Sequence, residues 1–296
     1  MLTLGVRGSR IWEGGPVTDS RGGTTSGRYE LMLRGLEGDP YLTYDCERSS
    51  LEDVEIEVGH AVAWISWHPH RQARWLTALS HPDDSETSAR AAIEVALRLA
   101  QRCEVEGRSI AGITLPRGGF AMLPSRLRPT ATDDWDWWCA SAAAGGLAPP
   151  RLLLSTWAGT VPVRDLHPDD PRLAALLALA SPNAPIRPGD PRVSRWAGIE
   201  ESGGDLADAG GLVAMVALVP MESGAVHLND VATHPLRRGR GLARALCATV
   251  ASDVLAQGRP AVTLGMYAHN DAARALYTSL GFTCGRRNTS GSLPPG

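Results

Sequence analysis

The chain has 296 residues, a formal net charge of −3 and 43% hydrophobic residues, which is typical of a folded protein with more than one core. This charge gives no support for nucleic-acid binding, because the 29 basic residues, all of them arginine, are interspersed with acidic residues. There is no apolar run of about 18 residues and no secretory leader, so we expect a cytoplasmic protein with no membrane partner. The five cysteines are scattered and lack C-x-x-C spacing, which argues against a disulfide framework and against a metal site.

The N-terminal half contains a predicted strand, a His-Pro loop, a helix and a second strand. The strands are ARWLTALS from residue 73 and SIAGITLP from residue 109, and the helix lies between them. The half ends in ATDDWDWW. Trp135, Trp137 and Trp138 favour packing in a core or at a domain interface over a cage for a cationic ligand.

A stretch of small residues, proline and glycine at 141–150 separates the two halves of the chain. We therefore expect an N-terminal domain over residues 1–145, a linker over 146–157 and a C-terminal domain over 158–296.

The C-terminal half alternates strands and helices in the order of a mixed-sheet α/β fold. In chain order, VPVRDL is a predicted strand, PRLAALLALA a helix and residues 181–192 a proline-rich loop. Predicted strands follow at VSRWAGIE, GLVAMVALVPM and AVHLNDVAT, and another, AVTLGM, begins at residue 261.

The most informative segment is VATHPLRRGRGLA at 231–243, where a strand passes through an Arg/Gly-rich turn into a helix. The helix is indicated by Leu242, Leu246, Val250 and Val254, which recur at steps of four. A helix N-terminus exposes unpaired N–H groups at the positive end of the helix dipole, and glycines allow close approach of an anion. The turn is therefore a predicted phosphate-binding site.

Two common phosphate-binding motifs do not fit this turn. A P-loop requires a lysine, and the chain contains none. A dinucleotide-binding G-x-G-x-x-G would need a third glycine where Arg244 stands, and an acidic residue about 20 positions further on at a strand end.

Arg238-Gly239-Arg240-Gly241-Leu242-Ala243 instead resembles the R/Q-x-x-G-x-G/A motif of the GNAT acetyltransferase superfamily, which wraps the pyrophosphate of acetyl-CoA. A second motif follows 27 positions later. Asn270, Ala273, Leu276, Tyr277, Gly281 and Phe282 match the family's N-x-x-A-x-x-L-Y-x-x-x-G-F signature. Asn270 is also a predicted helix N-cap and Gly281 a helix terminator. The resemblance covers about residues 158–287 and implies an acetyl-CoA-binding GNAT domain.

The resemblance also implies which residues bind the cofactor. The backbone of Val231 and Thr233 is expected to pair with the pantetheine arm, and an N–H near Val231 to polarise the thioester. The full implied cofactor-binding set is Val231, Ala232, Thr233, Arg238, Gly239, Arg240, Gly241, Leu242, Ala243, Asn270, Ala273 and Tyr277.

Two side chains are candidate catalytic groups. Tyr277 is the candidate general acid for the departing thiolate, with packing in the core as the alternative. His227 is the candidate general base, with a structural role as the alternative. Strand alternation predicts that His227, Asn229 and Val231 share one face, and that Asp230 lies on the other and pairs with an arginine.

The predicted function is an acetyl-CoA-dependent N-acetyltransferase in which a primary amine attacks directly within a ternary complex. The acceptor is a small-molecule amine or a peptide N-terminus. A non-catalytic acyl-CoA-binding or sensing module is the alternative. The acyl chain length, the identity of the acceptor and assembly into a homo-oligomer stay open.

The N-terminal half resembles a degenerate copy of the same domain, giving a tandem arrangement. His81-Pro82 and His234-Pro235 stand 153 positions apart, and this offset places Ser85, Glu86, Thr87 and Ser88 where the phosphate turn has Arg238 to Gly241. The first copy thus lacks both glycines and carries a carboxylate, so we expect it not to hold CoA.

Overall fold

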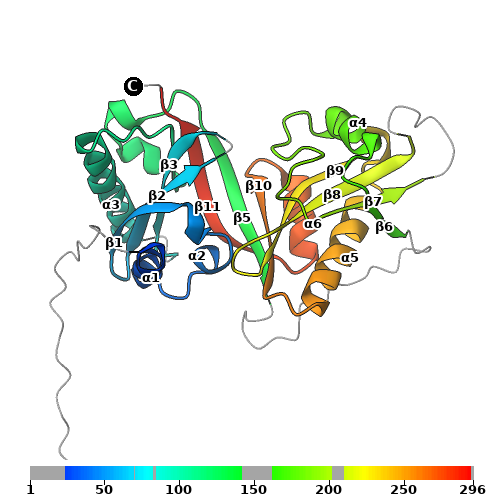
Figure 1. Ribbon diagram of the computed structural model, residues 1–296, viewed down its shortest axis with the longest axis horizontal. Coiled ribbons are helices and arrows are strands. Elements are labelled where there is room, and N and C mark those ends of the chain that lie inside the picture. The colour runs from blue at the N-terminus through cyan, green and yellow to red at the C-terminus, as the bar shows by residue number, and fades with distance from the viewer. Residues whose placement is uncertain (1–23, 70, 83–84, 142–161, 202–209, 295–296) are drawn as a thin grey trace, which may run out of the picture.

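The computed structural model describes residues 24–69, 71–82, 85–141, 162–201 and 210–294, which form two lobes around one 11-stranded mixed sheet (Figure 1). The strand order is β1-β2-β3-β4-β11-β5-β10-β9-β8-β7-β6. The expected linker at 146–157 lies outside the described residues. None of the described helices combines the length and the apolarity needed to cross a bilayer.

The first lobe is built mainly from the N-terminal half. Its helices are α1 (Thr25–Gly35), α2 (Pro40–Tyr44) and α3 (Glu86–Val105), with 3-10 turns η1 (Arg48–Ser50), η2 (Gly119–Met122) and η3 (Ser125–Leu127). Its strands are β1 (Leu51–Glu57), β2 (Ala61–His68), β3 (Ala73–Ser80), β4 (Gly112–Pro116) and β5 (Asp133–Ser141).

The second lobe follows the expected order of the C-terminal half. Its helices are α4 (Pro171–Ala180), α5 (Leu242–Ala256) and α6 (Asp271–Ser279), with the 3-10 turn η5 (Pro235–Arg237). Its strands are β6 (Val163–Leu166), β7 (Arg195–Glu200), β8 (Leu212–Pro220), β9 (Val226–Thr233) and β10 (Ala261–Tyr267), and the chain ends in β11 (Thr283–Ser292).

The two halves exchange their last strands. β11 pairs with β4 and β5, although about half the chain or more separates it from them. β5 in turn pairs with β10 on its other side. Each half therefore completes the sheet of the other, and the lobes are joined by backbone hydrogen bonds as well as by side-chain packing.

Both halves repeat one topology. Three antiparallel strands (β1 to β3, β7 to β9) lead through a helix (α3, α5) to a parallel neighbour (β4, β10). The expected offset of 153 does not fit the structure. It would place Leu76, which packs with α3, on Asn229, whereas Leu228 is the residue that packs with α5. An odd offset exchanges the two faces of a strand, so it would reverse the direction of every side chain. At the helix starts, the N-caps Ser85 and Gly241 stand 156 positions apart, which is an even offset.

The central tryptophans pack in the core, as predicted, and they lie on both faces of β5. Trp138 lies in the cluster beneath α5, whereas Trp137 is fully buried on the opposite face with Cys139. The edge of Tyr41 from α2 contacts the Trp137 ring at a centroid distance of 5.3 Å. Gly285 faces the same indole, and a Cβ there would lie 2.7 Å from it. The join between the lobes is therefore a packed core.

Candidate functional site

The Arg/Gly turn after β9 has the backbone geometry of an open anion cradle. Gly239 and Gly241 have φ of +76° and +77°, a region that glycine adopts without strain. A Cβ on either glycine would meet no atom within 4 Å. Gly241 is the N-cap of α5, and glycine has no side chain that could accept a hydrogen bond from the helix. The first N–H groups of α5 are therefore not capped by their own N-cap residue and are available to an anion.

Several arginines surround this turn, and the acidic side chains nearby do not neutralise all of them. Arg237 pairs with Glu201 at 2.6 Å, and the Arg238 guanidinium donates to the backbone oxygens of Thr233 and Ala180 at 3.4 and 3.3 Å. Arg240 is exposed, and the buried Nε of Arg244 has no partner in the described part of the chain. A group with several phosphate oxygens fits this donor set.

The edge of β9 next to the turn is also open. β9 and β10 are parallel and pair only over Val226 to Leu228 and Val262 to Leu264. Beyond these residues β10 continues to pair with β5 on its other side, so the two strands separate. The segment from Asn229 to Thr233 therefore presents an edge that no described strand covers, and this edge leads directly to the turn.

A β-bulge interrupts β9 where the strands separate. Ala217 pairs with Asn229 and Met215 with Ala232, so three steps on β9 oppose two on β8. Asp230 has φ of +50°, and its carboxylate accepts a hydrogen bond from the backbone N–H of Ile186 at 3.0 Å. Burial is the largest effect on the Asp230 carboxyl and raises its pKa. The hydrogen bond from Ile186 and the charges of Arg187 and Arg192 oppose this effect only in part, so the pKa is about 6.

The bulge overturns the expected alternation of side chains along β9. Val231 packs against the cluster beneath α5, whereas Ala232 is buried in the cluster beneath α4. His227 and Val231 therefore do not share a face. The expected ion pair of Asp230 with an arginine is not formed among the described residues. Its carboxylate accepts from the N–H of Ile186, and Arg187 and Arg192 act on it only through their charge. The extra residue changes the parity of every following side chain.

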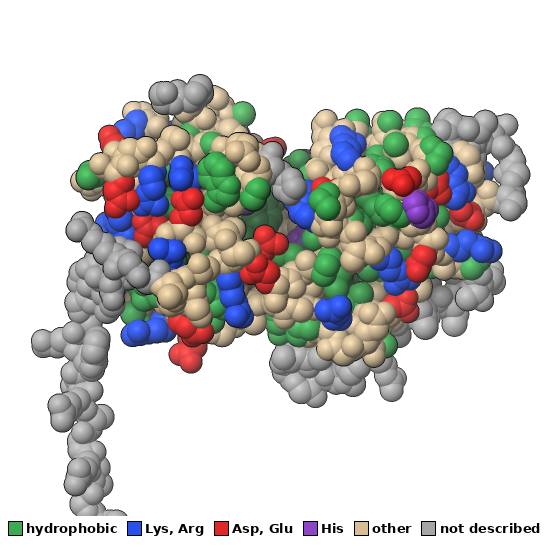
Figure 2. Space-filling view, viewed as in Figure 1, with side chains coloured by type: hydrophobic (Ala, Val, Ile, Leu, Met, Phe, Trp, Pro, Cys, Tyr) green, Lys and Arg blue, Asp and Glu red, His purple; other side chains and the backbone are tan. Residues whose placement is uncertain are grey.

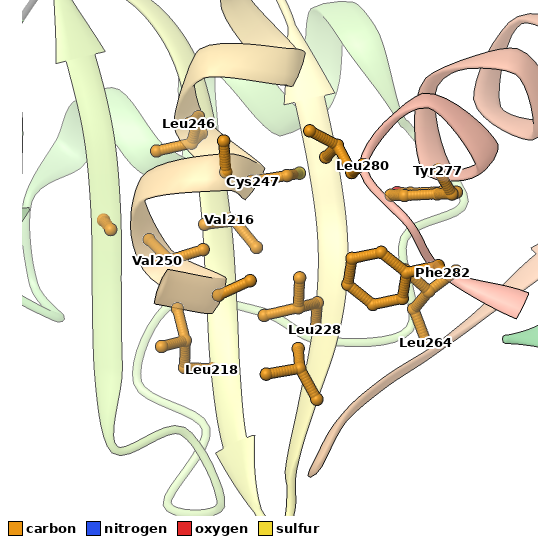
Figure 3. Packing of buried hydrophobic residues seen from close by; sticks show 14 of the residues in the cluster. Val216, Leu218, Leu228, Leu246, Cys247, Val250, Leu264, Tyr277, Leu280 and Phe282 are labelled. Carbon is orange, nitrogen blue, oxygen red and sulfur yellow. The ribbon is translucent and has the colours of Figure 1, made fainter. Parts of the chain in front are cut away.

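Tyr277 lies on the α5 side of the sheet. Its ring packs beside Phe282 at a centroid distance of 5.7 Å, near Leu280 and Cys247 (Figure 3). Its hydroxyl has no hydrogen-bond partner among the residues that the structure describes. Burial, together with Cys247, raises the pKa of Tyr277 well above its usual value of 10.0, so the phenol stays protonated at neutral pH. Tyr277 therefore packs in the core and also carries a phenolic proton, so its surroundings are compatible with both of its predicted roles.

Asn270 and Ala273 begin α6. The Asn270 side chain accepts from the Ala273 N–H at 3.0 Å, so the predicted cap is confirmed. The helix terminator is confirmed as well, because Gly281 has φ of +84°.

His227 faces the opposite side of the sheet. Its neighbour Leu228 packs beneath α5, whereas His227 lines a cleft of about 1180 Å³ between the lobes, visible as a hollow in Figure 2. The cleft walls come from α2, β2, β3, β4, β9, β11 and the loop before β7. Tyr277 and His227 are thus held on opposite faces of the sheet.

The His227 ring is fixed by a residue that the sequence did not point to. Nδ1 lies 2.8 Å from Asp45 Oδ1 and 2.9 Å from Thr263 Oγ1. Asp45 is the C-cap of α2 and stands 182 positions away in the chain. No motif surrounds Asp45, so only the packing of the lobes reveals it.

The equivalent helix start in the first lobe is closed. The Ser85 side chain caps α3 by accepting from the Ser88 N–H at 3.1 Å, and Glu86 adds a negative charge in the first turn. The Trp75 ring of β3 lies directly against Gly112 of β4, since a Cβ on Gly112 would be 2.0 Å from the ring. The indole therefore fills the space beside β4 in this lobe. These features disfavour a second phosphate site.

Comparisons with known proteins agree with this geometry. Residues 172–282 match the model of the acetyltransferase (GNAT) family. This region belongs to the GNAT family. No curated protein matches the chain at a significant level.

Solved structures of GNAT proteins resemble most of the chain. A GCN5-related N-acetyltransferase-like protein from Streptococcus suis is 14% identical, with 91% of this chain and 100% of that chain covered at a TM-score of 0.50. A GNAT-family acetyltransferase from Colwellia psychrerythraea is 11% identical, with coverages of 91% and 96% and a TM-score of 0.49. A GCN5-related N-acetyltransferase from Sphaerobacter thermophilus is 17% identical, with coverages of 80% and 78% and a TM-score of 0.48. The first of these supports the tandem GNAT-like fold across both lobes.

Proposed function

We propose that this protein is an N-acetyltransferase that uses acetyl-CoA and acetylates a primary amine by direct attack in a ternary complex. The observation that carries the proposal is the continuity of two features. The uncovered edge of β9 runs into the glycine turn at the start of α5, so an extended thiol arm and its pyrophosphate would occupy one continuous path.

The chain supplies backbone donors along that path. The amides from Arg238 to Ala243 would hold the pyrophosphate, since they surround a helix N-terminus with glycines of positive φ. Val231 and Thr233 would pair with the pantetheine amides along the open edge. Ala232 is buried against α4 and would contribute through its backbone. Asn270 caps α6 at the Ala273 N–H, and we assign both residues to the cofactor as the family motif implies.

The bulge at Asp230 is suited to polarise a thioester carbonyl. It leaves backbone donors of β9 without a partner on β10, in a part of the strand that is partly shielded from water. Donors that are fixed before the reaction stabilise a developing oxyanion most effectively. The backbone N–H near Val231 is our assignment for this role.

Two side chains would then move the protons. His227 accepts a proton from the attacking amine as the carbon–nitrogen bond forms. Tyr277 donates its phenolic proton to the thiolate as the carbon–sulfur bond breaks. Tyr277 then takes a proton from solvent and His227 releases one to solvent, so both groups return to their starting states. The products are an amide and the free CoA thiol. The placement of the two residues on opposite faces of the sheet supports this division, because acceptor and donor would approach from opposite sides.

The cleft between the lobes is the proposed acceptor site. Its volume of about 1180 Å³ accommodates either a small-molecule amine or the N-terminus of a peptide. The first lobe contributes a large part of its wall, including the side chains of Trp64, Trp67 and Trp75. The N-terminal half is thus assigned a role in forming the acceptor site, while only the C-terminal half binds CoA.

The test is calorimetric titration of acetyl-CoA into the wild type, Gly241→Glu and Gly258→Glu. The last variant is a matched control, because Gly258 also has φ of +77° and open space around its Cβ but follows the C-terminus of the same helix. We expect one equivalent of acetyl-CoA to bind to the wild type and to Gly258→Glu, and binding to Gly241→Glu to weaken by at least about 100-fold. Equal binding by all three proteins would reject the assigned phosphate site.

A screen of amines with detection of free thiol separates the two candidate functions. Acetyl-CoA-dependent thiol release with any amine supports the enzyme. Saturable binding without release for any amine class would favour the acyl-CoA-binding or sensing module instead.

A further inference from the structure

The contact between His227 and Asp45 joins the two lobes at the wall of the cleft. We propose that Asp45, from the N-terminal half, is the positioning residue that holds His227 as the general base of the C-terminal domain. This inference rests on the proposed acetyltransferase function. It makes the N-terminal lobe a part of the catalytic machinery, in addition to a wall of the acceptor cleft.

The geometry selects one tautomer of His227. Asp45 Oδ1 lies 2.8 Å from Nδ1, and a carboxylate there accepts the Nδ1–H. The Thr263 hydroxyl donates to the same Asp45 oxygen at 2.9 Å, so that oxygen is held by two donors. Nε2 then carries the lone pair and has no partner among the described residues. A base requires this arrangement, because the lone pair must be free on the side of the substrate.

Asp45 is itself fixed by α2. Its N–H donates to Tyr41 O at 2.9 Å, and the Ser223 hydroxyl from the β8–β9 turn donates to Tyr44 O at 2.7 Å. The start of the helix is held by Asp39, which accepts from the Leu42 N–H at 3.0 Å. Asp45 therefore cannot leave the His227 ring without displacing a helix that is anchored at both ends.

The titratable groups around the pair are of both kinds, charged and neutral. The charged ones are Asp39, Glu47 and Glu222, together with Arg192 from the loop before β7 and Arg286 from β11. Tyr41, Cys46 and Cys139 are neutral near pH 7, because burial raises their pKa values. Burial lowers the pKa of His227, but the charge and hydrogen bond of Asp45 outweigh it and raise the pKa above its usual value of 6.5. Burial raises the pKa of Asp45, but the charge and hydrogen bond of His227, with the Thr263 hydroxyl, hold it below 3.8.

An interlobe pair with a purely structural role would not require an accessible ring. Both His227 and Asp45 line the cleft, with 17% and 13% of their side chains exposed. The ring is thus paired on one nitrogen and open toward the proposed acceptor on the other. A stronger base follows from this pairing, since the carboxylate stabilises the imidazolium that forms when the amine loses its proton.

The test measures the His227 pKa by NMR in the wild type, Asp45→Asn and Glu222→Gln, with the resonance assigned by its absence in His227→Gln. Glu222→Gln is the matched control. It removes a negative charge from the same region, and Glu222 bonds to the N–H groups of Arg48 and Ser49 instead of His227. We expect the pKa to fall by about 1 to 3 units in Asp45→Asn and by much less in Glu222→Gln. Equal pKa values in the wild type and Asp45→Asn would overturn the proposal.

A second measurement needs only the folded wild type. The ¹⁵N shifts of neutral His227 should show the proton on Nδ1. A proton on Nε2 would overturn the proposal even if Asp45→Asn did not fold.

Kinetics then separate this inference from the proposed function. With an amine that turns over, the acid limb of kcat/KM should move to lower pH in Asp45→Asn and kcat should fall by about 10- to 100-fold, with acetyl-CoA binding unchanged. An unchanged pH profile and kcat would overturn the role of Asp45 alone. A wild type that binds no acetyl-CoA would overturn the proposed function, and the base role with it.

Discussion

Arg286 of β11 and Asp39 at the start of α2 form an ion pair buried where the two halves exchange strands. The two side chains are 6% and 4% exposed. The Arg286 guanidinium also donates to Ser80 O at 2.5 Å, and Asp39 caps α2. One pair thus connects the last strand of the chain to the helix that carries Asp45 and to the end of β3.

Arg286→Met should destabilise the protein strongly. The substitution retains most of the apolar side chain but leaves the Asp39 carboxylate buried without its cation. Removing one partner of a buried ion pair costs about 3–5 kcal/mol. We expect a loss of this size in the free energy of unfolding, measured by urea denaturation monitored by tryptophan fluorescence.

The double variant Asp39→Asn with Arg286→Met is the control for this prediction. It removes the uncompensated charge while an amide oxygen remains to accept from the Leu42 N–H, so it should recover part of the lost stability. If Arg286→Met is as stable as the wild type, the ion pair does not hold the exchanged strand in place.

Local sequence patterns predicted much of the second lobe. The helix PRLAALLALA is α4 at Pro171–Ala180, and its start is fixed by Asp170, which accepts from the Arg172 N–H. The four apolar residues spaced along LARALCATVASDVL are all buried on α5. These features depend on residues a few positions apart, and such spacing is visible in a sequence.

Features that depend on distant parts of the chain were not predictable in this way. The exchange of β5 and β11 brings β11 beside β4, where Thr289 lies opposite Leu115. No local pattern in either strand indicates that the two strands pair. Asp45 lies next to a short helix without a recognisable motif. The bulge at Asp230 was hidden because a single extra residue leaves the β-branched pattern of the strand intact, yet it reverses the side chains that follow.

Tyr277→Phe should reduce kcat while leaving acetyl-CoA binding intact. The substitution keeps the ring packed beside Phe282 and removes only the proton donor. Loss of a general acid lowers the rate by about 10²- to 10⁴-fold. Because burial raises the pKa of Tyr277 well above 10.0, the ratio of the two rates should stay constant from pH 6 to about 9.5.

The control for this variant is Tyr267→Phe. Tyr267 is 51% exposed at the end of β10 and stacks on His269, away from the α5 cluster. It should show the wild-type rate. Full turnover by Tyr277→Phe with unchanged binding would assign Tyr277 to the core alone.

Asp230 should make the protein less stable as the pH rises through the pKa of its carboxyl. Burial raises the pKa of Asp230 to about 6 from 3.8, so between these values the folded state keeps a proton that the unfolded state has lost. A state that binds more protons is favoured at lower pH, and this stabilisation is therefore complete below about pH 4 and disappears as the pH passes 6. Partial exposure to solvent reduces the effect to roughly 1–2 kcal/mol.

Asp230→Asn isolates this contribution. Asparagine tolerates the positive φ at the bulge, and its side-chain oxygen accepts from the Ile186 N–H, but it does not titrate. Urea unfolding of both proteins at pH 4, 5, 6 and 7 gives the difference in unfolding free energy, in which all other titrating groups cancel. The wild type should lose roughly 1–2 kcal/mol relative to Asp230→Asn across this range. A difference that does not change with pH would mean that the Asp230 carboxyl ionises equally in both states, and that the bulge is open to water.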